Sequence, residues 1–357
     1  MQQRLSVLAA CLVLSASRAA AGPMYTITDL GRTSSRNYPF NAANSLNNLG
    51  QIGGTVFDGT RNQVAIYNPD GTMTLLGSTG DFGGLNNLGQ AVFYSDNSYT
   101  SYLYSGGTVT QLTGIYRATA INDSGLIVGN SSNQTEFGTP GAFTTVAINC
   151  NSVAAGVNNS GIVIGTYENG CNRYWSGYWM DSAHPQNPSS IPPLSYPTDQ
   201  GRYGEISSPV AINNRNEIVG SSGVSQGVAH AFLLEPGVGL IDLCPSCGAS
   251  AAYGINNHGD IVGHTTLTAG FLYTPSLGLL DLNSLVDPSW PNDHNFIWDG
   301  IAINDSGQIL ADGAVNGFGT VFLLNPTESA APEPSTWAGA LMPLLAMAAR
   351  RKSTARR

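Results

Sequence analysis

The sequence predicts an all-β protein, a β-propeller of seven four-stranded blades. Three observations support this prediction. The 357 residues include 43 Gly and 19 Pro but only 10% charged residues, a composition that favours many short strands joined by turns. A nine-residue segment recurs seven times, and the better-preserved copies are followed by two further strand signals.

The recurring segment is a predicted β-hairpin. It reads INDSGLIVG at residues 121–129 and INNHGDIVG at residues 255–263. An apolar strand end is followed by two turn-forming polar residues, a Gly and a return strand, so we expect its side-chain chemistry to be secondary. A calcium loop is the alternative, but such loops need several oxygen ligands and most copies have at most one acidic residue. The first Asn of each copy is Asn47, Asn86, Asn122, Asn158, Asn213, Asn256 or Asn304.

Two more strands follow the hairpin in the clearest copies. Residues 230–234 read HAFLL and residues 239–243 read GLIDL, with Pro236 between them at a position suited to a turn. A similar pair occupies residues 270–273 and 278–282. Each repeat therefore supplies four strands, the content of one propeller blade.

These residues resemble the HAF family of extracellular repeats, named for a His-Ala-Phe like His230-Ala231-Phe232. The resemblance spans most of residues 24–326. It departs from the tripeptide at residues 141–143 (GAF) and 269–271 (AGF). It implies export and repetition, and no defined activity.

The two ends of the repeat region look complementary. Residues 25–30 (YTITDL) resemble a fourth strand without a preceding blade, whereas the last repeat ends after its third strand at residues 320–324. Pairing the two would complete seven blades and remove exposed sheet edges. We therefore predict a propeller at residues 22–327 that is closed by its N-terminal strand.

The N-terminus has the layout of a secretory signal peptide at residues 1–21. Arg4 precedes an apolar run at residues 5–16, and three Ala residues at 19–21 precede the expected cleavage site. Residues 8–11 (LAAC) also resemble a lipoprotein box, but the apolar run continues past Cys11.

The C-terminus consists of a linker at residues 328–336, containing Pro332-Glu333-Pro334, and of an apolar segment with a basic end at residues 337–357. This region resembles the PEP-CTERM sorting tail. The resemblance implies a Gram-negative bacterium, an exosortase-type processing enzyme as partner, transient membrane contact and removal of the tail. The apolar run is shorter than the roughly 17 to 25 residues of a lasting membrane anchor, which is the alternative. We therefore expect a secreted protein, extracellular or at the cell surface.

Charge limits the partners of the mature chain. Of 14 basic residues only seven lie between the two terminal signals, and none of these is Lys. Nucleic acid and anionic polysaccharide are disfavoured because they require clustered cations. A neutral glycan or a matrix protein remains, so we expect a binding or scaffolding role. The alternative is a surface glycoside hydrolase whose carboxylates converge on one propeller face.

Four cysteines remain in the exported chain: Cys150, Cys171, Cys244 and Cys247. Three pairings are possible, and we favour Cys150 with Cys171 and Cys244 with Cys247, because each bond would join neighbouring loops. The Cys-x-x-Cys spacing also occurs in thiol oxidoreductases, but the strand-to-helix setting that lowers a thiol pKa is missing.

No catalytic residue, metal ligand or cofactor site is predicted, because no motif of those classes occurs in its required setting. The candidate ligand-binding residues are Trp290, His294 and Trp298, in an insertion at residues 283–299. A second insertion spans residues 181–205, and insertions in repeat folds gather on one face. The aromatic rings there either stack on a ligand or cap the blade ends.

Overall fold

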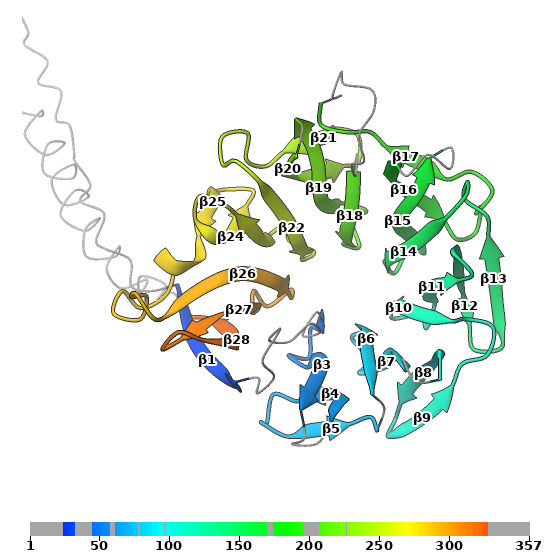
Figure 1. Ribbon diagram of the computed structural model, residues 1–357, viewed down its shortest axis with the longest axis horizontal. Coiled ribbons are helices and arrows are strands. Elements are labelled where there is room, and N and C mark those ends of the chain that lie inside the picture. The colour runs from blue at the N-terminus through cyan, green and yellow to red at the C-terminus, as the bar shows by residue number, and fades with distance from the viewer. Residues whose placement is uncertain are drawn as a thin grey trace, which may run out of the picture.

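The computed structural model describes residues 24–32, 45–57, 61–77, 79–95, 98–169, 174–195, 207–225 and 227–327. Seven four-stranded antiparallel sheets stand around one axis (Figure 1). This confirms the predicted seven-bladed β-propeller.

Blades 1 to 3 each use four consecutive strands. Blade 1 contains β2 (Ser45–Leu46), β3 (Ile52–Phe57), β4 (Asn62–Tyr67) and β5 (Met73–Leu75). Blade 2 contains β6 (Gly80–Leu85), β7 (Ala91–Ser95), β8 (Thr100–Ser105) and β9 (Thr108–Gln111). Blade 3 contains β10 (Arg117–Ile121), β11 (Ile127–Ser131), β12 (Gln134–Thr139) and β13 (Ala142–Val146).

Blades 4 to 6 repeat this arrangement. Blade 4 contains β14 (Ser152–Val157), β15 (Ile162–Asn169), β16 (Tyr174–Asp181) and β17 (Ser189–Ile191). Blade 5 contains β18 (Ser207–Ile212), β19 (Ile218–Ser225), β20 (Val228–Glu235) and β21 (Gly239–Asp242). Blade 6 contains β22 (Ser250–Ile255), β23 (Ile261–Thr265), β24 (Ala269–Thr274) and β25 (Gly278–Asp281), and the short 3-10 helix η1 (Leu282–Ser284) follows it.

Blade 7 joins the two ends of the chain. It contains β26 (Phe296–Ile303), β27 (Ile309–Val315) and β28 (Phe318–Pro326), and its outer strand is β1 (Tyr25–Arg32). Ile27 of β1 lies opposite Leu324 of β28, and Figure 1 shows the two strands side by side. Tyr25 is 7% exposed, and its N–H donates to the Leu285 carbonyl at 3.0 Å. The predicted closure is confirmed.

The core lies between neighbouring blades, and the repeat motif explains how it is filled. In blade 6, Phe271 of β24 is fully buried opposite Gly263 of β23. A Cβ on Gly263 would lie 2.8 Å from the Phe271 ring, so the Gly of the Ile-Val-Gly segment makes room for the aromatic residue of the third strand. Glu136 occupies the corresponding position in blade 3, opposite Gly129, and is buried there.

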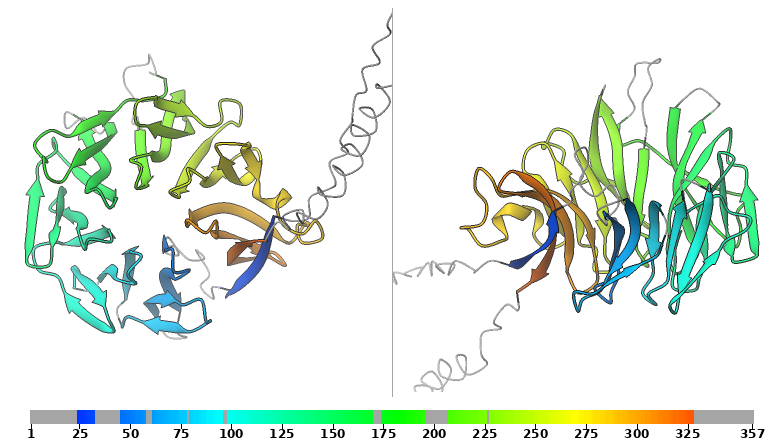
Figure 2. Two further views of the ribbon diagram at one scale, coloured as in Figure 1. Left: turned by 180° about the vertical axis from the view of Figure 1, so that it is seen from behind. Right: turned by 60° about the horizontal axis from the view of Figure 1, so that its bottom comes forward.

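Strand direction gives the propeller two different faces (Figure 2). Every inner strand runs toward its Asn turn, so these turns share one face, the Asn face. The connections from one blade to the next lie on the other, the connection face. The two predicted insertions extend over both faces: the β16–β17 turn at residues 182–188 lies on the Asn face, whereas residues 192–195, after β17, and residues 285–295 lie on the connection face. Within the described residues, no helix has the length and apolarity to cross a membrane.

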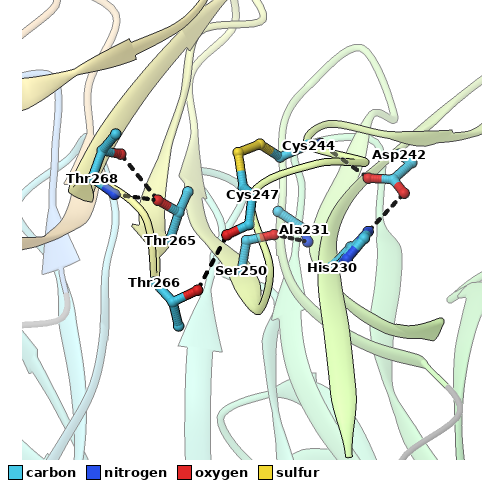
Figure 3. Close-up of a disulfide and its surroundings, with 9 residues drawn as sticks. All are labelled: His230, Ala231, Asp242, Cys244, Cys247, Ser250, Thr265, Thr266 and Thr268. Carbon is cyan, nitrogen blue, oxygen red and sulfur yellow. Dashed lines mark hydrogen bonds and ion pairs between the residues drawn. A yellow bond between two sulfur atoms is a disulfide. The ribbon is translucent and has the colours of Figure 1, made fainter. Parts of the chain in front are cut away.

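A disulfide and a partly buried His–Asp pair secure the connection from blade 5 to blade 6 (Figure 3). Cys244 and Cys247 are bonded, as the sequence predicts, with their Cα atoms 5.4 Å apart. His230 Nδ1 lies 2.8 Å from one oxygen of Asp242, whose other oxygen accepts the Cys244 N–H at 2.9 Å. The His of the HAF tripeptide therefore holds the disulfide loop against the third strand.

Candidate functional site

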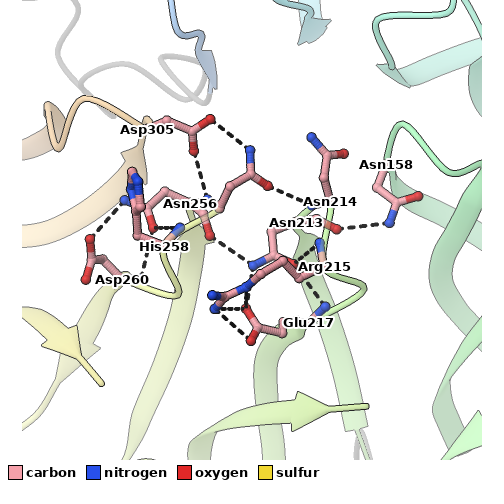
Figure 4. A network of polar contacts seen from close by, with 10 residues as sticks. Asn158, Asn213, Asn214, Arg215, Glu217, Asn256, His258, Asp260 and Asp305 are labelled. Atoms are coloured by element: carbon pink, nitrogen blue, oxygen red, sulfur yellow. Dashed lines mark hydrogen bonds and ion pairs between the residues drawn. The ribbon is translucent and has the colours of Figure 1, made fainter. Parts of the chain in front are cut away.

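The seven repeat hairpins meet around the axis and hold one another through the first Asn of each copy. Asn256 shows the arrangement (Figure 4). Its Oδ1 accepts the N–H groups of His258 and Asp260, each at 2.9 Å, which closes its own turn. Its Nδ2 donates to the backbone carbonyl of Asn304 in the next blade at 3.2 Å. One buried side chain therefore fixes a turn and links two blades.

The same link occurs seven times and forms a closed circle, which we call the Asn ring. All seven Asn residues are 3 to 5% exposed. Each Nδ2 donates to the carbonyl of the next member: Asn47 to Asn86 (2.9 Å), Asn86 to Asn122 (3.0 Å), Asn122 to Asn158 (2.8 Å), Asn158 to Asn213 (2.9 Å), Asn213 to Asn256 (2.9 Å), Asn256 to Asn304 (3.2 Å) and Asn304 to Asn47 (3.0 Å).

The following residue of each copy forms a second circle nearer the solvent, the mouth ring. Its members are Asn48, Asn87, Asp123, Asn159, Asn214, Asn257 and Asp305. The backbone N–H of each donates to the Oδ1 of the next at 2.8 to 2.9 Å, and the last bond runs from Asp305 to Asn48. Backbone donors thus hold seven side chains in fixed positions around the axis.

Two carboxylates orient four of the five amides in the mouth ring. Asp123 Oδ2 accepts the Nδ2 groups of Asn87 (3.0 Å) and Asn159 (2.7 Å). Asp305 Oδ2 accepts those of Asn48 (2.7 Å) and Asn257 (2.8 Å).

Partial burial would raise the pKa of the Asp305 carboxyl. The hydrogen bonds from Asn257 and Asn48, with nearby His258, outweigh burial and lower this pKa below its ordinary value. Asp305 therefore remains ionised at neutral pH.

The fifth amide differs from the others. Asn214 Oδ1 accepts the Asn159 N–H, but its Nδ2 makes none of the hydrogen bonds found among the described residues. The side chain is exposed at the mouth of an axial cavity of about 170 Å³, which is lined by three residues from every repeat. The amide nitrogen of Asn214 is therefore available to a ligand.

The predicted β-hairpin is confirmed, but the expectation that its side-chain chemistry is secondary is wrong. The side chains form both rings. A signal was present in the sequence: the first position is Asn in all seven copies, although a turn alone also accepts Asp, Ser or Gly. The contacts themselves join residues 36 to 257 positions apart, so spacing could not reveal them.

The three predicted ligand residues of the insertion each contact a different part of the structure. Trp290 packs edge-on against buried Phe322, with ring centroids 5.1 Å apart. Trp298 is 39% exposed, and its carbonyl lies 3.2 Å from His264 Nδ1. The His294 carbonyl accepts the Gly317 N–H at 2.8 Å.

Other predicted positions lie outside the described residues. These are Cys171, the favoured partner of Cys150, the signal peptide, and Pro332, Glu333 and Pro334 of the tail.

One pair of carboxyl groups does converge, on blade 7. Asp299 of β26 lies opposite Asp312 of β27, and the two side chains are hydrogen-bonded. His264 of blade 6 lies 2.7 Å from Asp299. Burial and then the Asp299 charge raise the pKa of Asp312 to about 7. Glycoside hydrolysis needs carboxyl groups about 5 to 9.5 Å apart with the sugar between them, which directly bonded groups do not provide.

The described residues contain no group of three or more His, Cys, Asp or Glu arranged to hold a metal ion. No protein-family model matches the chain, and no curated protein matches it.

Solved structures share its fold. The acylaminoacyl peptidase of Pyrococcus horikoshii superimposes with a TM-score of 0.50 at 12% identity, over 80% of this chain and 52% of the peptidase. The tricorn protease superimposes with a TM-score of 0.39 at 11% identity, over 82% of this chain and 32% of the protease. The chain thus spans about half the length of the first of these proteins, and the likeness extends to the propeller fold alone.

Proposed function

We propose that this chain is an exported protein of the cell surface or extracellular matrix of a Gram-negative bacterium, and that it binds or scaffolds a neutral glycan. Residues 1–21 and 328–357 support export and sorting, through the signal layout and the PEP-CTERM resemblance. The absence of Lys between the two signals supports an uncharged partner.

The axial cavity carries the proposal. Its mouth presents amide groups from five blades and carboxylates from the other two, and backbone bonds fix their positions before any ligand arrives. Such preorganisation reduces the entropy lost on binding. Neutral amides suit hydroxyl groups, which both donate and accept hydrogen bonds. About 170 Å³ is less than most drug-sized pockets occupy, so the cavity suits one sugar residue or the end of a chain.

A glycan array tests the proposal with one isosteric variant. Asn214→Asp keeps the Oδ1 acceptor for Asn159, replaces the available N–H donors with a second carboxylate oxygen and adds one negative charge. Asn62→Asp, on the exposed start of β4, introduces the same charge far from the axis. We expect the purified protein to bind at least one neutral glycan, with tenfold weaker binding in Asn214→Asp and unchanged binding in Asn62→Asp. Equal binding by both variants would place the ligand elsewhere.

The sorting proposal has its own measurement. The secreted protein should lack Arg356 and Arg357 by intact mass, because a short apolar segment with a basic end favours transient retention followed by cleavage. Replacing Pro332, Glu333 and Pro334 with Ala should leave the tail attached. Wild-type protein secreted with its tail would contradict the proposal.

A further inference from the structure

A cluster of aromatic side chains lies on the connection face, where blade 2 meets blade 3. Tyr99 belongs to the β7–β8 turn, and Tyr116 precedes β10. Their rings are stacked, with centroids 5.7 Å apart and planes inclined by 12°, and Tyr116 lies 6.0 Å from Tyr94 of β7. Tyr99 is 61% exposed and Tyr116 44% exposed. We call Tyr94, Tyr99 and Tyr116 the Tyr platform.

The platform is held rigidly from beneath. Ser101 of β8 is fully buried, and its hydroxyl donates to the Tyr116 carbonyl at 3.0 Å. The same hydroxyl accepts the Ala118 N–H at 2.8 Å. The Leu112 N–H donates to the Ser101 carbonyl at 2.8 Å, which fixes the start of the segment that carries Tyr116. An exposed aromatic ring on a fixed backbone loses little entropy when a ligand covers it.

The backbone of Tyr99 is strained. Its φ of 51° lies in the left-handed region, where bulky residues are rare. The corresponding turn of blade 3 uses Ser132 and Asn133, a small residue and a turn former, at positive φ. Strain of this kind persists where the surrounding structure imposes it, and it clusters at ligand sites. Here it directs an aromatic ring into solvent.

A polar pair borders the aromatic rings. Arg117 Nη2 lies 2.8 Å from Asp81 Oδ2, and the two side chains are 53% and 47% exposed. The Arg117 guanidinium lies 5.6 Å from the centre of the Tyr94 ring, so the pair adjoins the platform. Together the two residues offer donors and acceptors of hydrogen bonds with no net charge.

We propose that the Tyr platform, with Arg117 and Asp81, is a binding site for a pyranose ring of a neutral glycan. A sugar ring has an apolar C–H face and hydroxyl groups at its edge. The exposed tyrosine rings match the face by stacking, and the Arg117–Asp81 pair matches the hydroxyls. Stable protein interfaces bury about 800 Å² on each partner, far more than two exposed tyrosines supply.

This site is independent of the axial cavity, because the platform lies on the connection face and the mouth ring lies on the Asn face. If both sites are occupied, one molecule joins two glycan chains, which gives a scaffolding role a physical basis. The inference adds a second site to the proposed function and rests on separate residues.

Calorimetric titration of the purified protein with cellopentaose, laminaripentaose and mannopentaose tests the site, with trigalacturonate as the acidic probe. Two variants remove the platform: Tyr99→Gly, in which glycine adopts the positive φ without strain, and Tyr116→Ala. Phe318→Ala is the matched control, because Phe318 is 57% exposed at the first position of β28, directly after the corresponding turn of blade 7.

We expect at least one neutral probe to bind, with affinity at least tenfold weaker in both Tyr variants and unchanged in Phe318→Ala. Melting temperatures of the variants establish that they are folded. A neutral probe whose binding is lost only in Asn214→Asp overturns the platform and leaves the axial site standing. Tighter binding of trigalacturonate, or no binding of any probe, also overturns the inference.

Discussion

The carboxyl pair on blade 7 predicts an unusual dependence of stability on pH. Burial and the neighbouring Asp299 raise the pKa of Asp312 from an ordinary 3.8 to about 7. Between these values the folded state holds a proton that the unfolded state has released, so stability falls as pH rises. Between pH 5 and pH 8, the free energy of unfolding falls mainly over the roughly two pH units that lie below the folded pKa. Each of these pH units costs about 1.4 kcal/mol. Because Asp312 is only half-buried, we expect about 2 kcal/mol.

Asp312→Asn isolates this contribution, because the amide can still donate to Asp299 but does not titrate. Urea unfolding curves from pH 5 to pH 8 should show the wild type losing about 2 kcal/mol relative to the variant. Asp293→Asn, at an exposed position, controls for removing one charge and should follow the wild type. Parallel profiles for Asp312→Asn and the wild type would refute the reasoning.

Three further predictions concern the frame of the propeller. Asn256→Ala should lower the free energy of unfolding in urea by about 2 to 4 kcal/mol, because it removes four hydrogen bonds from a buried position. Asn257→Ala, nearer the solvent, should cost about 1 kcal/mol. Equal losses in the two variants would contradict a structural role for the Asn ring. Deleting β1 (Tyr25–Arg32) should lower the free energy of unfolding by at least about 5 kcal/mol and cause self-association, measured by calorimetry and light scattering. A truncated protein that stays monomeric with unchanged stability would show that the propeller does not depend on the pairing of β1 with β28. Reducing Cys244–Cys247 should lower stability by about 2 kcal/mol without unfolding the chain, since the closed loop is short; complete unfolding on reduction would contradict this.

The architecture could be predicted from the sequence because each blade is a local unit. The turn residues, the Ile-Val-Gly return strand and the Pro236 turn all act within a few positions. Closure of the ring by the N-terminal strand could also be predicted, because the unpaired strand at residues 25–30 and the incomplete last repeat are both visible in the sequence. Local chemistry therefore defined the blades and their number.

The two proposed binding surfaces could not be predicted from the sequence, because they depend on which residues the ring brings together. Asn304 donates to Asn47 across 257 positions, and the neighbours of Asp299 belong to another blade and another strand. Tyr99 and Tyr116 do not stand out in the sequence for the same reason. Trp290 stood out by composition but packs on Phe322, whereas Tyr99 and Tyr116 meet only because blades 2 and 3 adjoin.

The pairing of β1 with β28 has a consequence for how the molecule is made. The Thr320 hydroxyl donates to Asp29 across 291 positions, so β1 has no partner strand until β28, the last described strand, has been synthesised. Contacts this distant in sequence form slowly, because a long chain must first be brought together. When a ribosome or a translocation channel delivers the chain from its N-terminus, β1 stays unpaired while blades 1 to 6 are delivered. Synthesis of β28, rather than the folding of any single blade, therefore sets the earliest moment at which the propeller can close.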